Sequence, residues 1–285
     1  MLRPDEPLSV ARLIASPALT PATVDALRRF AAGSMLACVS DADVNASFLS
    51  LQIADLTQTA QLKKLAEIIG AQGAHDRALR LELQPPDPAT LRDDALRAIA
   101  IELHGILQAP VYVGRRSTSV SAWATQRPMS FGPAGLYLQS VAPVLPYGGS
   151  ESNGLAIEVG KHTTIIKARL VGAALDASSL AAIAAAVGGP DSGFIEAAAY
   201  PMGQRKDGAS ILLVELGDLR RTPAHRVLQV VEIEAQRFGA RLGLGALLSD
   251  APLELFIGAL GMHMGLPMSA AQVIETRVPH PAAMP

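Results

Sequence analysis

The chain has 285 residues, of which 49% are hydrophobic and 18% are charged, and its formal net charge is −2 at pH 7. The slightly negative net charge and the absence of basic runs exclude a protein that binds the phosphate backbone of nucleic acids. The single cysteine, Cys38, excludes an intrachain disulfide framework and fits a reducing compartment. Because we find neither a signal-peptide pattern nor an uninterrupted apolar run of membrane length, we expect a cytoplasmic protein that does not enter a membrane.

Apolar spacing and turn residues predict a first half in which strands alternate with helices. The expected strands cover 8–13, 34–39, 47–53, 77–83 and 109–114, and the expected helices cover 20–31, 55–69 and 91–107. Thr20 is the expected N-cap of the first helix, with Pro21 at its first position. Strands 47–53 and 77–83 alternate apolar and polar residues, which predicts that each is buried on one face only.

The second half repeats this order after a stretch, 115–160, that is rich in Gly, Pro and Ser. Its expected strands cover 163–171, 193–200, 211–216 and 242–248, and its expected helices cover 176–187, 222–238 and 253–264. Thr222 is the expected N-cap of the middle helix, whose apolar face includes Val227 and Phe238. The repeated order predicts an α+β protein with two ferredoxin-like βαββαβ units.

Several short sequence motifs lie within these predicted elements and the turns between them. The longest runs over 218–239, with the letters D-x-x-x-T-P-x-H-x-V followed by E-A-x-R-x-G. Shorter motifs lie at 40–47 (SDADVNAS), 73–77 (GAHDR) and 130–133 (SFGP). Together they resemble the motifs of the glutamate formiminotransferases, enzymes that move a formimino group from formiminoglutamate to tetrahydrofolate. The resemblance covers most of 8–265 and is sharpest in the C-terminal unit.

The resemblance implies two ferredoxin-like subdomains packed around a shared cleft or tunnel. An N-terminal-like subdomain is expected at 1–133, a linker and the start of the second subdomain at 134–160, a C-terminal-like subdomain at 161–275 and a loose tail at 276–285. Tetrahydrofolate is the implied co-substrate, and a homodimer is the implied assembly. Asn153 and Gly154 fall where the family's second subdomain contributes to the folate groove, and ordinary loop chemistry is the other explanation of this pair.

His75 matches the catalytic histidine of the family. An imidazole titrates near neutral pH, so one side chain can take a proton from the attacking folate nitrogen and return one to the departing amine. The alternative interpretation is a solvated loop histidine beside Asp76 and Arg77. Arg77, from the same motif, is an expected substrate-binding residue.

Asp41, Asp43 and Asn45 are the other expected substrate-binding residues. A carboxylate there can steady the positive charge of a formimino group. Turns between strands also select Asp and Asn for hydrogen bonds to their own backbone, so the alternative interpretation needs no ligand.

The chain departs from the family's pattern at positions where Val44, Ala46 and Ala74 replace polar residues. Two hypotheses follow: an enzyme of the formimino-transfer type, whose donor can differ from formiminoglutamate, and a catalytically silent or repurposed relative that binds a small molecule or acts as a partner subunit. Elsewhere, His225 is predicted to be neutral and partly packed, and Cys38 to be a buried, inert thiol. No histidine has a partner at metal-site spacing, so we expect no metal.

Overall fold

The computed structural model describes residues 9–16, 18–31, 34–53, 60–71, 78–85, 91–107, 111–115, 154–160, 163–188, 194–252, 255–256 and 259. These residues form α-helices and two β-sheets, so the protein is of the mixed α+β class. Among the described helices, none is long and apolar enough to cross a membrane.

The first sheet has six strands in the order β2-β3-β1-β4-β6-β5. Along the chain its half contains β1 (Ser9–Ser16), α1 (Pro21–Phe30), β2 (Met35–Asp41), β3 (Ala46–Ile53), α2 (Ala60–Gly70), β4 (Ala78–Gln84), α3 (Asp93–Leu107), β5 (Val111–Arg115) and β6 (Gly154–Val159). The pairs β1–β3, β1–β4 and β2–β3 are antiparallel, whereas β6 is parallel to both β4 and β5. The first sheet is therefore mixed.

The second sheet has the order β10-β7-β9-β8, with β11 also paired to β7, and every described pair is antiparallel. Its half contains β7 (Thr164–Gly172), α5 (Ala177–Gly188), β8 (Ala197–Gln204), β9 (Ser210–Leu216), α6 (Ala224–Arg237), β10 (Ala240–Leu242) and β11 (Ala246–Leu247). Counted along the chain, the first four strands of both halves stand in the sheet in the order fourth, first, third, second. The structure thus repeats its topology as well as its sequence of elements.

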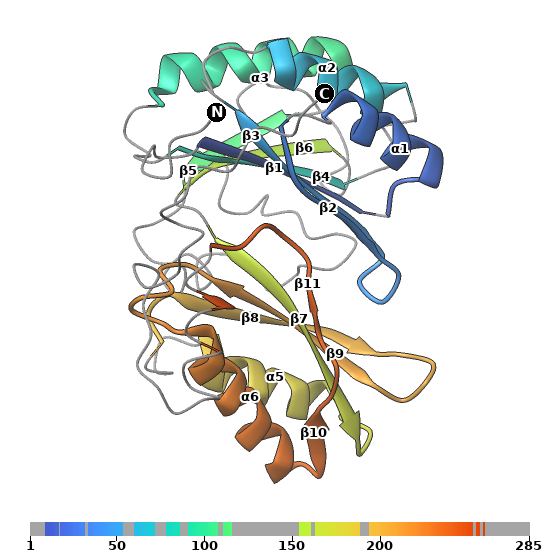
Figure 1. The fold of residues 1–285 in the computed structure, drawn as a ribbon, viewed down its shortest axis with the longest axis vertical. Helices are drawn as coiled ribbons and strands as arrows, with labels where there is room; N and C mark the ends of the chain where they lie inside the picture. The colour runs from blue at the N-terminus through green and yellow to red at the C-terminus, as the bar shows by residue number, and fades with distance from the viewer. Residues whose placement is uncertain are drawn as a thin grey trace, which may run out of the picture.

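The two sheets face each other between outer layers of helices, as Figure 1 shows. Helices α1, α2 and α3 cover the outer face of the first sheet, and α5 and α6 cover that of the second. One apolar cluster lies between each sheet and its helices, and a third cluster joins the two halves. Both faces of both sheets are consequently buried over much of their area.

Two helix starts follow from their local sequence. The Thr20 hydroxyl accepts a hydrogen bond from the Thr23 amide at 3.2 Å, and Pro21 follows at the first helical position. The Asp176 carboxylate accepts one from the Ser179 amide at 2.7 Å. The predicted N-cap of α1 is therefore confirmed, and Asp176 caps α5 in the same way.

Two parts of the prediction for α6 were wrong: its N-cap, and Phe238 as a residue of its buried face. The N-cap is Pro223, which has no side chain that can accept a bond, while Thr222 is buried. Phe238 is the C-cap and remains 37% exposed, so it does not belong to the buried face that Val227 occupies. Gly239, with a φ of 76°, takes the left-handed conformation that ends many helices.

The prediction that strands 47–53 and 77–83 are buried on one face only was also wrong. In β3 almost every residue is buried, and in β4 the polar residues Arg80, Glu82 and Gln84 are as buried as the leucines between them. The reason is the second sheet, which covers the face that the alternation had assigned to solvent.

Two further elements differ from the sequence-based expectation. Strand β6 was not predicted; it lies between β4 and β5 in the first sheet, although its residues fall in the interval 134–160 that was expected to link the halves. The expected strand 242–248 is divided into β10 and β11, and a Cβ at Gly245 between them would overlap the carbonyl oxygen of Lys167. The expected helix 253–264 and the tail 276–285 lie largely or wholly outside the described residues.

Candidate functional site

The strand ends beside the predicted site residues meet at one edge of the first sheet. Ser16, at the end of β1, pairs with Ala78, which begins β4, and Ala78 pairs in turn with Gly154, which begins β6. At the same edge, β2 ends and β3 begins where Asp41 pairs with Ala46. Segments that are far apart in the sequence therefore leave or enter the sheet side by side.

The structure describes some of the predicted site residues and not others. His75, Arg77 and Asn153 lie outside the described residues, and Gly154 is described as the first residue of β6. The described residues that follow His75 and Arg77, beginning with Ala78, stand at the edge just defined.

The turn between β2 and β3 holds its polar residues by local bonds. The Val44 amide donates to one oxygen of Asp41 at 3.1 Å, and the Ala18 amide donates to the Asn45 side-chain oxygen at 3.4 Å. Asn45 has a φ of 52°, a left-handed conformation that Asn tolerates better than most residues. Turn chemistry thus accounts for one oxygen of Asp41 and for the presence of Asn45.

A lysine from the second sheet contacts one oxygen of each carboxylate. Lys167, in β7, places its Nζ 2.5 Å from Asp41 Oδ2 and 2.9 Å from Asp43 Oδ2. The side chains of Lys167 and Asp41 are each 11% exposed, and that of Asp43 is 36% exposed. Burial alone would lower the pKa of Lys167, but its hydrogen bonds to both carboxylates and their charges raise it above the usual 10.5. Lys167 is therefore a charged ammonium at neutral pH.

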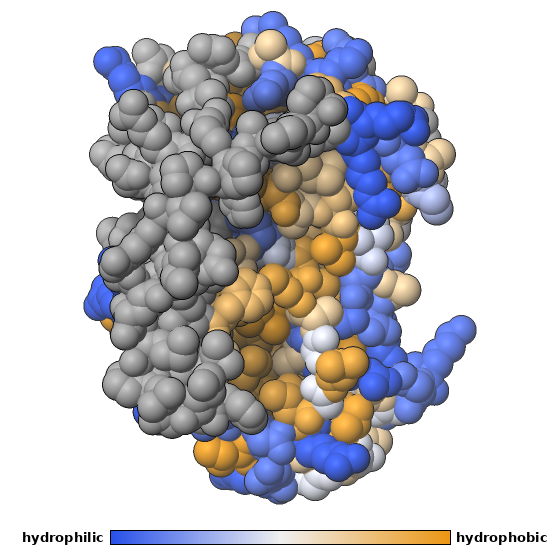
Figure 2. Space-filling view, viewed as in Figure 1, coloured by the Kyte–Doolittle hydropathy of each residue, from blue (hydrophilic) through white to orange (hydrophobic). Residues whose placement is uncertain are grey.

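Two positions where the family carries polar residues belong to the core between the sheets. Val44 is 2% exposed and Ala46 is 3% exposed. Their cluster, which we call the inter-sheet apolar cluster, contains Ile14, Val44, Ala46, Phe48, Ile165, Ala198, Tyr200, Ile211, Leu213 and Leu248. Figure 2 shows apolar side chains gathered across the middle of one face, at the level where the sheets meet in Figure 1.

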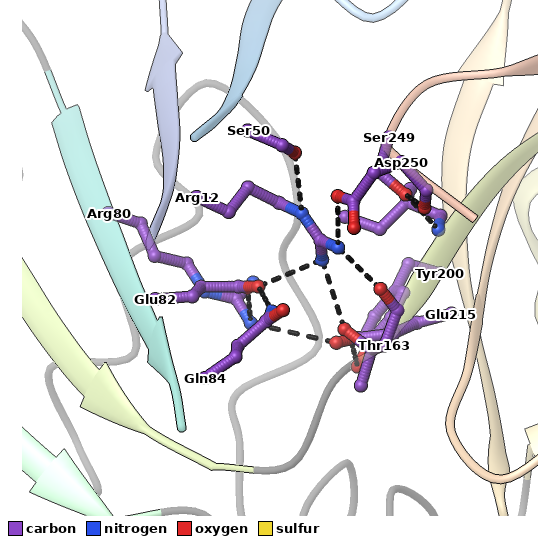
Figure 3. Close-up of polar contacts among 11 residues, drawn as sticks. Arg12, Ser50, Arg80, Glu82, Gln84, Thr163, Tyr200, Glu215, Ser249 and Asp250 are labelled. Atoms are coloured by element: carbon purple, nitrogen blue, oxygen red, sulfur yellow. Dashed lines mark hydrogen bonds and ion pairs between the residues drawn. The ribbon is translucent and has the colours of Figure 1, made fainter. Parts of the chain in front are cut away.

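Beside this cluster, a buried arginine joins the two halves (Figure 3). Arg12, in β1, is fully buried and donates to Glu82, to the Thr163 hydroxyl and to Asp250, each at 3.0 Å, and also to the Thr163 carbonyl. A longer bond of 3.4 Å reaches Ser50. One guanidinium therefore connects β1, β3 and β4 with two segments of the second half.

A second arginine extends the same polar cluster. Arg80 pairs with Glu82 and lies 3.7 Å from Glu215 of β9, while Tyr200 donates to Glu215 at 3.3 Å and Gln84 donates to Glu82 at 2.8 Å. Burying charges is costly unless they are paired and hydrogen-bonded, and each of these charges has a partner of opposite sign. This set fixes one half against the other (Figure 3). We call it the Arg12 cluster; it contains Arg12, Ser50, Arg80, Glu82, Gln84, Thr163, Tyr200, Glu215 and Asp250.

Neither Lys167 nor the Arg12 cluster was predicted from the sequence. The available signal was a charged residue inside an otherwise apolar strand: Arg12 in SVARLIAS, and Lys167 with Arg169 in TIIKARLVG. Such a residue is unusual because charged side chains are rarely buried without a partner. The partners lie 126 and 151 residues away along the chain, so no spacing rule could name them.

The remaining candidates give no further site. In the described part of the chain, no group of His, Cys, Asp and Glu could hold a metal ion. Burial, and then the charge of Arg226, hold the pKa of His225 below its usual 6.5, which agrees with the prediction of a neutral, partly packed side chain. Cys38 is partly exposed on β2, so its prediction as a buried thiol was wrong.

No family model matches this chain, and a search of curated proteins finds no match either. The likeness to formiminotransferases therefore depends on the motifs of the sequence alone.

Proposed function

We propose that this protein is a divergent relative of the formiminotransferases, built from two ferredoxin-like subdomains whose sheets face each other. The repeat supports this proposal, because both halves run βαββαβ along the chain and place four strands in the same order. In the described part of the chain, the inter-sheet apolar cluster and the Arg12 cluster fill the region between the sheets. A cleft or tunnel for a ligand is therefore expected nearer the edge that carries the predicted site residues.

The proposed activity is transfer of a formimino or related one-carbon group to tetrahydrofolate, from a donor that can differ from formiminoglutamate. The observation that carries it is the convergence on one sheet edge of the β2–β3 turn and of the strand starts at Ala78 and Gly154. Transfer between two bound molecules depends on holding them in a reactive orientation, and a shared edge allows segments distant in the sequence to do so.

Each predicted residue has a role in this proposal. His75 takes a proton from the accepting amine and returns one to the departing amine, which contributes roughly two to four orders of magnitude in rate. Arg77, Asp41, Asp43 and Asn45 hold the donor. Tetrahydrofolate, when bound, would supply the accepting amine.

The folate end of the proposed site includes Asn153 and Gly154. Gly154 has no side chain, and it stands beside Ala78 at the edge of the first sheet. A residue of this kind leaves room for a flat ring to approach the backbone, so it fits the proposed co-substrate. By the same resemblance we propose a homodimer, which sedimentation of the purified chain would test.

A second candidate is a catalytically silent or repurposed relative that binds a small molecule or acts as a partner subunit. Two observations favour it. Val44 and Ala46 are part of the inter-sheet apolar cluster, where the family carries polar residues. In addition, the ammonium of Lys167 already pairs with one oxygen of Asp41 and one of Asp43.

A transfer assay on the full chain separates the two candidates. Binding of tetrahydrofolate and of formiminoglutamate is measured first by calorimetry, and transfer is then followed for the wild type, His75→Ala and the control His225→Ala. A loss of at least about a hundredfold in His75→Ala alone supports the enzyme. Folate binding without transfer in any of the three proteins supports the repurposed relative, and equal rates for the wild type and His75→Ala remove His75 from the mechanism.

A further inference from the structure

The contact between Lys167 and the β2–β3 turn has a geometry that bears on which ligands can bind there. Asp41 is oriented before any ligand arrives, because one of its oxygens accepts the Val44 amide at 3.1 Å and the other faces the Lys167 ammonium at 2.5 Å. Asp43 is the more exposed of the two carboxylates, so the pair opens toward solvent on its side. The turn therefore presents a preformed place for a positive charge.

The backbone of Lys167 is fixed by the pairing of β7 with its neighbouring strands. It pairs with Leu213 of β9 on one side and with Ala246 of β11 on the other, and its carbonyl oxygen lies against Gly245. Its neighbour Ile165, two residues earlier on the same face of β7, is fully buried in the inter-sheet apolar cluster. With the backbone fixed and the stem 11% exposed, the ammonium has little freedom to move aside.

An amidine group is a cation with N–H donors, and two carboxylates are its natural partners. In this protein an internal cation already lies between them. For a cationic amidine to bind there, two positive charges would have to share the site, or a largely buried ammonium would have to lose both of its partners.

We infer that Lys167 is a specificity-determining residue, an internal cation that excludes cationic amidines from the Asp41–Asp43 turn and makes the turn select a neutral, hydrogen-bond-accepting group. An ammonium has three N–H donors, of which two go to the carboxylates, and in the described part of the chain the third has no partner. That third donor is available to a carbonyl oxygen. The inference depends on the proposed function in one respect: it takes this turn as the place where the transferred group binds, which makes that group a neutral one-carbon group related to formimino and not the charged formimino group itself.

Formamide and formamidinium test the inference, because the two small molecules have nearly the same shape and differ in charge. Each is titrated at equal concentrations into isotope-labelled full-length protein, and the amide NMR signals of residues 41–45 are followed. The wild type is expected to respond more strongly to formamide. Lys167→Met is expected to reverse this preference and to bind formamidinium at least about tenfold more tightly than the wild type, since a like charge has been removed.

Three variants complete the experiment. Lys64→Met is the matched control, because Lys64 also pairs with a carboxylate, at 2.8 Å from Glu67, but on the exposed surface of α2; it should behave as the wild type. Lys167→Gln removes the charge while keeping a donor, and it stands in if Lys167→Met does not fold. Adding Asp41→Asn to the Lys167 variant should abolish formamidinium binding.

Two results would overturn the inference. One is that formamidinium binds at the turn of the wild type as tightly as it does in the Lys167 variants, and the other is that formamidinium does not bind to those variants at all. Failure of both Lys167→Met and Lys167→Gln to fold also overturns it, because Lys167 would then be a structural clamp. Absence of transfer in the wild type together with the reversed preference would reject the enzyme and leave the role of Lys167 standing. Transfer from formiminoglutamate that depends on Asp41 would reject the role of Lys167 and leave the enzyme standing.

Discussion

Replacing Arg12 by methionine is expected to destabilise the protein strongly, because Arg12 connects the two halves from a fully buried position. Methionine fills a similar volume, so the main loss is charge. Two carboxylates lose their ion pair with Arg12: Glu82, which is 1% exposed, and Asp250, which is 11% exposed. Removing one partner of a buried ion pair costs about 3–5 kcal/mol. Because Glu82 keeps Arg80, we expect the lower part of that range, which is still a large share of the roughly 5–15 kcal/mol that stabilises a typical domain.

Urea unfolding followed by circular dichroism measures this loss, with the slope against urea checked for constancy between variants. The matched control is Arg28→Met, since Arg28 pairs with Asp25 at 3.7 Å with both side chains more than half exposed. That variant should lose no more than about 1 kcal/mol. Arg12→Lys keeps the charge but lacks the planar fork, so its stability should lie between those of the wild type and Arg12→Met. If Arg12→Met unfolds within about 1 kcal/mol of the control, the Arg12 cluster does not stabilise the contact between the halves.

Four further outcomes follow from the geometry. Gly188→Ala should lower the free energy of unfolding by about 1–3 kcal/mol, because the new Cβ would lie 2.5 Å from the Ala199 nitrogen. Gly105→Ala has open space around it and should raise the free energy of unfolding by up to about 1 kcal/mol. If urea unfolding shows both variants changing stability in the same direction, the packing argument is contradicted. Thr20→Ala should cost about 1 kcal/mol in the same assay by removing the N-cap of α1, and an unchanged midpoint would refute the cap. Burial alone would lower the pKa of Lys167, but Asp41 and Asp43 raise it, so its stabilising contribution should be complete below pH 10.5 and decline as the pH rises further. Alkaline unfolding of the wild type and Lys167→Met should therefore converge, and divergence would contradict the ion pair. The imidazole of His225, buried and near a positive charge, should titrate below 6.5 by NMR, and a midpoint above that value would contradict its packing.

The candidate site could be predicted from the sequence only in part. The turn with Asp41 and Asn45 was recognisable because Asp and Asn favour turns, and the structure does place it between two strands. Lys167 could not be assigned to that turn, since it lies 126 residues further along the chain and a charge inside an apolar strand does not say which residue it pairs with. Arg12 was equally hidden, with its hydrogen-bond partner Thr163 151 residues away.

The sequence by itself determined the βαββαβ order of elements that both halves share and the N-caps of α1 and α5, because periodicity, capping bonds and turn residues act over a few positions. Only the tertiary structure decided that β3 and β4 are buried on both faces, that β6 enters the first sheet, and that Lys167 and Arg12 find carboxylates in the opposite half. These features depend on one sheet covering the other. The neighbours of a residue along the chain do not determine which distant segment packs against its side chain. The polar face that the sequence pattern assigned to solvent is therefore the face where the two halves meet.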